Sequence, residues 1–170
     1  MIDFLILYEL NKSVLTMYGI SREILSEFSV LTTPSYGTIK PALAKLERLG
    51  CVKSQKTMSL GGRPSTYYSI TDKGKARLKE LLLEQPQDNP IQFLPFARIR
   101  LACADLLTNS EQKKLFSILK LKSTTIFADI KRNLENEEIE FYPKMIFDNL
   151  SCEYKNFISL LEGFERASKN

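Results

Sequence analysis

The segment between Pro34 and Gly74 most constrains the fold, because a helical pattern in it changes abruptly to a strand pattern. Its first part carries apolar residues at helical spacing, at Ile39, Leu43, Leu46 and Leu49. After Gly50 the residues alternate between two faces in a basic run. A second short run, from 66 to 70, is rich in Tyr and Thr, and a Gly-Gly-Arg-Pro sequence lies between the two runs. This pattern predicts a helix followed by a β-hairpin with a basic loop.

A helix followed by a basic hairpin is the layout of a winged helix-turn-helix, in which the helix enters a DNA groove and the hairpin reaches the flanking backbone. Within residues 34–63 there are six cations and one anion, which is a local positive surface suited to phosphate. The bland alternative is a solvated basic face without a ligand. The candidate DNA-binding residues are Ser35, Tyr36, Thr38, Lys40 and Lys45 on the helix and Lys53, Lys56, Arg63 and Tyr67 on the hairpin.

The rest of the chain indicates a second, helical domain. A Pro-rich polar stretch at 86–90 reads as a linker, and helical patterns continue from 91 to the end. We therefore predict a mainly α protein with a small β-hairpin, made of a winged helix-turn-helix domain at 1–85 and a helical dimerisation domain at 91–170. The positive charge supports this division, because residues 1–85 hold 12 Lys and Arg against 8 Asp and Glu, whereas residues 86–170 hold 12 of each.

The last predicted helix, from about 142 to 167, suggests a homodimer. Its large apolar residues follow alternating steps of three and four, a spacing that lets one helix lie along another. Packing within one chain, against 115–134, is the alternative. The first predicted helix, at 2–10, is apolar on most sides and also needs a cover. The predicted dimer residues are Phe4, Leu7, Phe147, Leu150, Tyr154, Phe157, Leu161 and Phe164.

Composition excludes several classes of function. There is no histidine, and neither a P-loop nor a nucleophile elbow occurs, so we expect no enzyme, no cofactor and no metal site. Three dispersed cysteines without a CxxC pair, and the lack of a signal peptide, predict a cytoplasmic protein. No apolar stretch approaches the roughly 20 residues that a membrane helix needs. Phe93 and Phe96 are candidates for a pocket that binds a small apolar or phenolic effector, although core packing also accounts for them.

The sequence also resembles the PadR family of bacterial transcriptional regulators. The resemblance is carried by Tyr36-Gly37-Thr38-Ile39-x-Pro41-Ala42-Leu43-x-x-Leu46-Glu47-x-x-Gly50, then by Gly61-Gly62-Arg63-Pro64, and then by Tyr68-x-Ile70-Thr71-x-x-Gly74. It implies a homodimeric repressor of a pseudo-palindromic operator. Two positions depart from the family's pattern: Lys40 replaces an aromatic residue, and Ser65-Thr66 replace basic residues. These departures leave two alternatives open, a winged helix used for protein–protein contact and a small-molecule-binding protein with vestigial DNA affinity.

Overall fold

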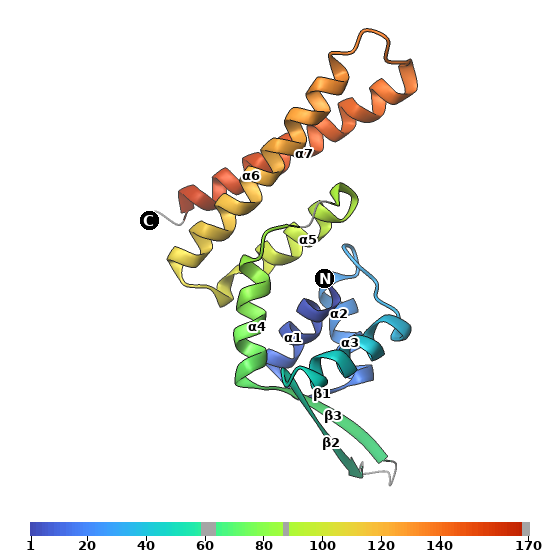
Figure 1. Ribbon diagram of the computed structural model, residues 1–170, viewed down its shortest axis with the longest axis vertical. Coiled ribbons are helices and arrows are strands. Elements are labelled where there is room, and N and C mark those ends of the chain that lie inside the picture. Colours follow the sequence, from blue (N-terminus) through green and yellow to red (C-terminus); the bar gives the residue numbers. More distant parts are fainter. Residues whose placement is uncertain (59–63, 87–88, 168–170) are drawn as a thin grey trace. The chain divides into compact units, whose positions relative to one another are not determined.

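The computed structural model describes residues 1–58, 64–86 and 89–167. The described residues form seven α-helices, one 3-10 turn and three strands, in the order shown in Figure 1. The N-terminal elements are α1 (Ile2–Lys12), β1 (Leu15–Thr16), α2 (Met17–Phe28), α3 (Tyr36–Arg48), β2 (Val52–Met58), β3 (Pro64–Ile70) and α4 (Asp72–Leu83). The C-terminal elements are α5 (Pro90–Ala102), the turn η1 (Ala104–Leu106), α6 (Asn109–Leu134) and α7 (Phe141–Ala167). The predicted fold class is confirmed.

The chain forms two compact units. The first comprises Met1–Glu84 with Pro95–Cys103, and the second comprises Gln85–Leu94 with Ala104–Asn170. Helix α5 therefore contributes to both units, its first residues to the second and the remainder to the first. The sequence-based division assigned everything after residue 90 to the second domain. The return of Pro95–Cys103 to the first unit is not marked by any change in composition.

Helix α1 forms the centre of the first unit. Four consecutive side chains, Phe4 to Leu7, are fully buried, which is possible only for a helix covered on several sides. The cover comes from α2, α3, α4 and β3. Since α1 is enclosed within its own unit, its apolar surface needs no second chain to cover it.

Side-chain caps define where the helices of the first unit begin. The hydroxyl of Thr16 accepts a hydrogen bond from the backbone N–H of Gly19 at 3.1 Å, and Thr71 accepts one from Gly74 at the same distance. The cap at Thr71 agrees with the sequence pattern. For α2 the sequence leaves two starts open, a cap at Ser21 or a start at Met17, and the structure begins the helix at Met17. Gly74 is required by close packing, because a Cβ there would lie 2.1 Å from the carbonyl oxygen of Cys51.

The wing, which is the β2–β3 hairpin, projects from the helices of this unit (Figure 1). The strands are antiparallel and β3 is central, because the two residues of β1 pair with Tyr67 and Tyr68 on its other edge. Strand β1 was not predicted, since a two-residue strand carries no periodicity. Val52 pairs with Ile70 and Ser54 pairs with Tyr68, so Tyr68 shares the apolar face and Tyr67 lies on the other, as the alternation predicts.

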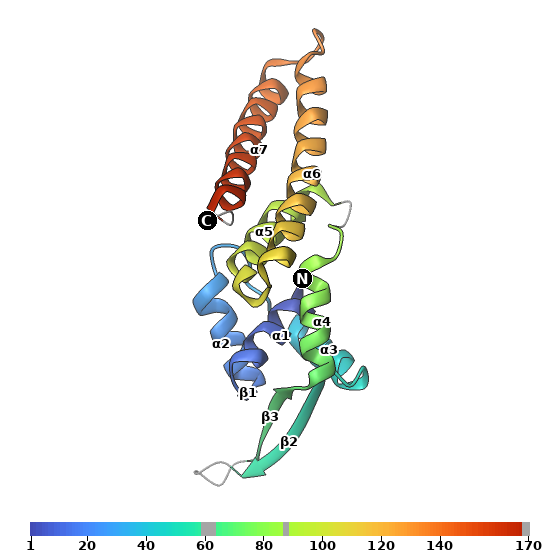
Figure 2. The same cartoon turned by 90° about the vertical axis from the view of Figure 1, so that its left-hand side faces the viewer.

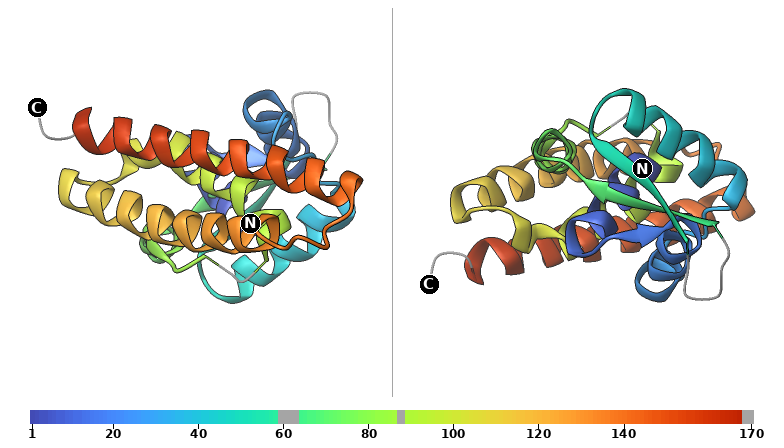
Figure 3. Two further views of the ribbon diagram at one scale, coloured as in Figure 1. Left: turned by 90° about the horizontal axis from the view of Figure 1, so that it is seen from above. Right: turned by 90° about the horizontal axis from the view of Figure 1, so that it is seen from below.

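In the second unit, α6 and α7 form an antiparallel helical pair and lie side by side along most of their lengths (Figures 2 and 3). Thr108 and Glu111 form a reciprocal capping box at the start of α6, with the N-cap one residue before the Asn109-Ser110-Glu111 cap that the sequence predicts. The buried face of α7 comprises Tyr154, Phe157 and Leu161. Phe93 of α5 stacks on Tyr154 and meets Phe157 edge-on, with ring centroids 6.3 Å apart in both pairs.

Candidate nucleic-acid interface

Helix α3 has one buried face and one open face. Ile39, Ala42, Leu43 and Leu46 are buried. The side diametrically opposite, by the helical period, carries Gly37, Pro41, Ala44 and Arg48, all of which are exposed. Small residues at the centre of this open face allow the helix backbone to approach a ligand closely. Arg48 is not among the predicted DNA-binding residues. Counting the helical period from the buried Ile39 places Arg48 on the open face, so this signal could have found it.

The predicted N-terminal readers gather around the start of α3. Ser35 is the N-cap residue, and its hydroxyl lies 3.2 Å from that of Thr38. Tyr36, Thr38 and Lys40 are exposed, with Tyr36 46% accessible. The structure therefore places Ser35 and Thr38 in contact and leaves Tyr36 and Lys40 exposed on the same helix terminus. Such groups can donate hydrogen bonds to phosphate oxygens and to base edges.

Two contacts of α3 side chains hold the helix to its own unit. The ammonium group of Lys45 donates to Asp3 of α1 at 2.6 Å. The hydroxyl of Ser54 on β2 donates to the carboxylate of Glu47. Burial and the charge of Glu47 raise the pKa of Tyr68. Lys45 thus already has an anionic partner, which offsets part of the charge that it could offer to DNA.

The strand register separates the two predicted cations of the wing. Lys56 is two residues from Ser54 and lies on the strand face that contacts α3. Lys53 pairs with Ser69 on the opposite face, together with the half-buried Tyr67. Of the two lysines, Lys56 is the one that shares a side with α3. Arg63 lies outside the described residues.

The other predicted sites are placed as follows. Phe4 and Leu7 have no exposed surface, and Tyr154, Phe157 and Leu161 are at most 3% exposed. Phe147 and Leu150 are half-buried, whereas Phe164 is 39% exposed and stacks on Phe116 of α6. The apolar seam of α7 is therefore occupied within its own chain, which is the alternative that the sequence left open.

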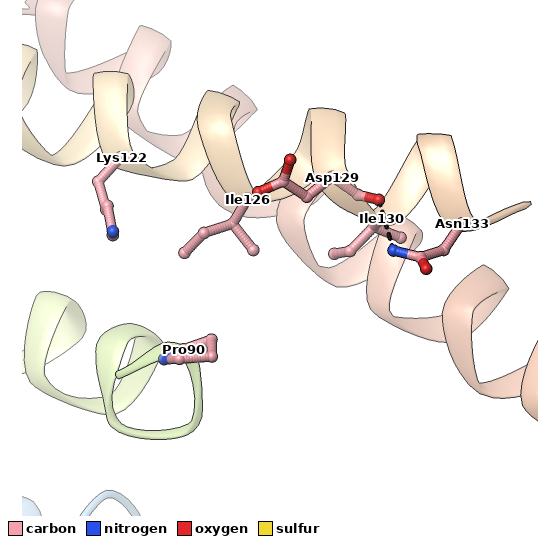
Figure 4. A pocket seen from close by; sticks show the side chains of 6 residues that line it. All are labelled: Pro90, Lys122, Ile126, Asp129, Ile130 and Asn133. Atoms are coloured by element: carbon pink, nitrogen blue, oxygen red, sulfur yellow. Dashed lines mark hydrogen bonds between the residues drawn. The ribbon is translucent and has the colours of Figure 1, made fainter. Parts of the chain in front are cut away.

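The two phenylalanines chosen for an effector pocket belong to different units. Phe93 is 4% exposed and packs on α7, whereas Phe96 packs edge-on against Phe4 at 5.8 Å. The second unit has a cavity of about 250 Å³ elsewhere, shown in Figure 4. It is lined by Pro90, Lys122, Ile126, Asp129, Ile130 and Asn133. Neither phenylalanine lines this cavity.

Within the described ranges, no three Cys, Asp or Glu side chains are grouped so that they could hold a metal ion. None of the helices in the same ranges is both long and apolar enough to cross a membrane.

Comparison with known proteins relates the N-terminal part of the chain to one family. The model of the transcriptional regulator PadR-like family matches residues 6–80, which includes most of α1 and continues through the wing into α4. This match supports a DNA-binding transcriptional regulator. The comparison with curated proteins gives no match.

Several solved structures of PadR-like and other regulators are similar to this chain. PadR of Bacillus subtilis, determined in complex with operator DNA, is 22% identical, with 98% of each chain covered and a TM-score of 0.48. A transcriptional regulator of Clostridium thermocellum is 30% identical over 46% of this chain and 76% of its own, with a TM-score of 0.43. The protein smu.1704 of Streptococcus mutans is 31% identical over 47% of this chain and 71% of its own, with a TM-score of 0.41.

Proposed function

We propose that this PadR-like protein is a homodimeric repressor that binds a pseudo-palindromic operator in the cytoplasm. One observation supports the proposal: the start of α3 exposes Ser35, Tyr36, Thr38 and Lys40 to solvent, on the unit that also bears the wing. Paired copies place two such helices on successive turns of DNA, about 34 Å apart, which is why a dimer reads a pseudo-palindrome. Arg63, Tyr67 and the lysines of the wing are assigned to the flanking backbone.

The assignment of α3 is tested by comparing two lysines that lie on the same helix. Lys40→Ala is expected to change which base is preferred at one half-site position, at a cost of about 1–3 kcal/mol there. Lys45→Ala removes the same charge, but Lys45 is already bonded to Asp3, so its effect is expected to be smaller and independent of sequence. Mobility shifts on the protein's own promoter region and on single-base variants of the bound site measure both. A uniform loss over all sites for Lys40→Ala makes Lys40 a phosphate contact.

The wing offers a second matched pair. Lys56→Ala is expected to lower the slope of log Kobs against log salt concentration by about one, because one phosphate contact is lost. Lys53→Ala should leave this slope nearly unchanged, since Lys53 lies on the strand face away from α3. If Lys53→Ala lowers the slope and Lys56→Ala does not, the wing contacts DNA through the strand face that carries Lys53.

A small effector remains part of the proposal. The cavity on α6 combines an apolar floor, Ile126 and Ile130, with polar groups from Lys122 and Asn133 (Figure 4), so it suits a small amphipathic molecule such as a phenolic acid. Phe93 and Phe96, the candidates from the sequence, do not line this cavity. An effector must raise the melting temperature and weaken operator binding together. A compound that stabilises the protein without changing DNA affinity is not the regulator's effector.

A further inference from the structure

Glu47 is the one acidic residue among the six cations of segment 34–63. It lies in the last turn of α3, where the helix dipole is negative and a carboxylate is disfavoured. It follows Lys40 by seven residues, close to two helical turns, so it lies on the same exposed stripe of the helix as Lys40 and Ala44. In the proposed orientation of α3, a negative charge on this stripe also repels DNA. Neither effect is offset by an ion pair, because Glu47 pairs with none of the described cations of this segment.

The carboxylate of Glu47 instead contacts the wing. It accepts a hydrogen bond from the hydroxyl of Ser54 on β2, and the cross-strand partner of Ser54 is Tyr68 on β3. Burial, and after it the charge of Glu47, raise the pKa of Tyr68, so the carboxylate acts on both strands. Among the described residues, no other side-chain hydrogen bond joins α3 to the strands of the wing.

The sheet order leaves β2 as the edge of the wing that no further strand supports. Strand β1 pairs with Tyr67 and Tyr68 and so holds β3, whereas β2 has a neighbouring strand on one side only. At its start β2 is tied to α3 by the backbone N–H of Cys51, which donates to the carbonyl of Leu46 at 2.9 Å. Ser54 lies three residues further along, about 10 Å from Cys51. Two attachments this far apart fix the direction of β2 relative to α3, whereas one would allow the strand to tilt.

A tilt of β2 has its largest effect on the cation that lies further out on the same strand face. Lys56 is two residues beyond Ser54, about 17 Å along the strand from Cys51. A tilt of about 15° at the start of the strand moves Lys56 by about 4 Å, which exceeds the length of a hydrogen bond to a phosphate oxygen. The contact between Glu47 and Ser54 therefore controls whether Lys56 reaches a phosphate of the DNA that α3 binds.

We propose that Glu47 is a positioning residue for the wing. By holding Ser54 it fixes the angle between α3 and β2, so that α3 and Lys56 contact one DNA site together. This inference rests on the proposed function of α3 and the wing, and it gives a role to the one anion of the basic segment. The gain in alignment exceeds the repulsion between this carboxylate and the phosphates.

Three substitutions in the full chain separate positioning from charge. Glu47→Gln removes the charge but keeps an oxygen that accepts from Ser54, Glu47→Ala removes both, and Ser54→Ala removes the contact without changing any charge. Glu47→Gln is expected to bind operator at least as tightly as the wild type. Each alanine variant is expected to lose about fivefold in affinity at about 0.15 M salt and to lower the salt slope by about one, the effect of one lost phosphate contact.

Coupling, base preference and stability are the controls. Because the two alanine substitutions remove one contact, the double variant should bind no more weakly than either single variant. The ranking of single-base operator variants should stay that of the wild type, since α3 keeps its reading residues. The midpoint of urea unfolding should also stay the same, because both side chains are exposed. If Glu47→Ala raises the affinity as Glu47→Gln does, the carboxylate only repels DNA and the proposal is wrong.

The angle between α3 and β2 can also be measured without DNA. Spin labels are attached at Ala44→Cys on α3 and Thr57→Cys on β2, both exposed positions, in a Cys152→Ser background that removes the exposed native thiol. Diluting labelled chains with unlabelled ones leaves only distances within one chain. Pulsed electron paramagnetic resonance is expected to give a wider distance distribution for Glu47→Ala and Ser54→Ala than for the wild type and Glu47→Gln. Equal widths in all four proteins would overturn the proposal.

The two measurements distinguish this inference from the proposed function. If the wild type shows no operator binding while Glu47→Ala widens the distance distribution, the repressor proposal fails, whereas Glu47 still positions the wing. If the wild type binds operator and neither alanine variant changes the affinity or the width, the repressor proposal stands and the role of Glu47 is refuted.

Discussion

Replacing Arg100 with Met is expected to lower the free energy of unfolding of the first unit by about 3–5 kcal/mol. The side chain is 2% exposed, and its guanidinium caps the C-terminal end of α4. Nε donates to the carbonyl oxygen of Leu82 at 2.8 Å, and a terminal nitrogen donates to that of Glu84 at 2.8 Å. Burial lowers the pKa of Arg100 to about 10, so the group stays charged at neutral pH and interacts favourably with the negative end of the helix dipole.

The direction of this effect depends on what the substitution leaves behind. Exchanging a buried charge for an apolar group can be neutral or stabilising when its partners are exchanged as well. Here the partners are backbone carbonyls, which cannot be removed and would remain buried without a donor. The cost of the unpaired carbonyls is therefore expected to exceed the gain from removing a desolvated charge.

Arg77→Met is the matched control for Arg100→Met, because Arg77 lies on α4 but its side chain is 41% exposed and pairs with Glu80 one turn away. Its effect is expected to stay within about 0.5 kcal/mol. Urea unfolding, monitored by circular dichroism, measures both variants. Equal stabilities of the two variants would mean that the α4 end is held by other contacts.

The elements whose patterns are local could be predicted from the sequence. The spacing from Ile39 to Leu46 gave the buried face of α3, and Thr71 and Glu111 marked two helix starts through their caps. Alternation placed Tyr68 on the inner face of the wing and Tyr67 on the outer. These features depend on residues within about one helical turn or on the neighbouring strand. Such short-range patterns can be read directly from the sequence.

Features that depend on distant contacts could not be predicted in this way. The spacing of the apolar seam on α7 fits α6 of its own chain as well as it fits a helix of another chain. Only the structure shows that Tyr154, Phe157 and Leu161 face inward. The partnership of Lys45 with Asp3, 42 residues away, is equally invisible to periodicity. This ion pair matters for function because it distinguishes Lys45 from Lys40, whereas the sequence pattern gives both lysines the same predicted role.

Buried charged residues could not be predicted from the sequence either, because charged residues usually lie on the surface. Arg100 and Glu9 are both buried, and both lie in the first unit. Arg100 satisfies its donors with the end of a helix. Glu9 satisfies only one of its two carboxylate oxygens, and this difference predicts a dependence of stability on pH.

Glu9→Gln is expected to stabilise the protein at pH 8 and to have little effect below pH 4.5. Glu9 is 1% exposed; its Oε2 lies 3.2 Å from the ammonium of Lys12, while its Oε1 has no hydrogen-bond partner among the described residues. Burial raises the pKa of Glu9 from 4.5 to about 7, and the nearby Glu27 and Glu23 act in the same direction, while Lys12 opposes the shift.

The direction of this pH dependence follows from how tightly Glu9 binds its proton in the folded and unfolded states. A folded carboxyl group that holds its proton more tightly than the unfolded one makes stability greatest below pH 4.5, and that stability is lost as the pH rises to about 7. At 1.36 kcal/mol per pKa unit, the loss is about 3 kcal/mol. Glutamine keeps the shape without the ionisation, so it removes this loss, and Lys12 keeps Glu27 as a partner.

Thermal unfolding at pH 4.5, 6 and 8 checks this prediction, with Glu27→Gln as the control. Glu27 is partly exposed, so its replacement only removes a surface pair with Lys12 and is expected to destabilise by less than about 1 kcal/mol. The two variants should therefore differ in sign at pH 8. If Glu9→Gln instead destabilises the protein equally at pH 6 and pH 8, the carboxylate is ionised in the fold and its bond to Lys12 outweighs the cost of burial.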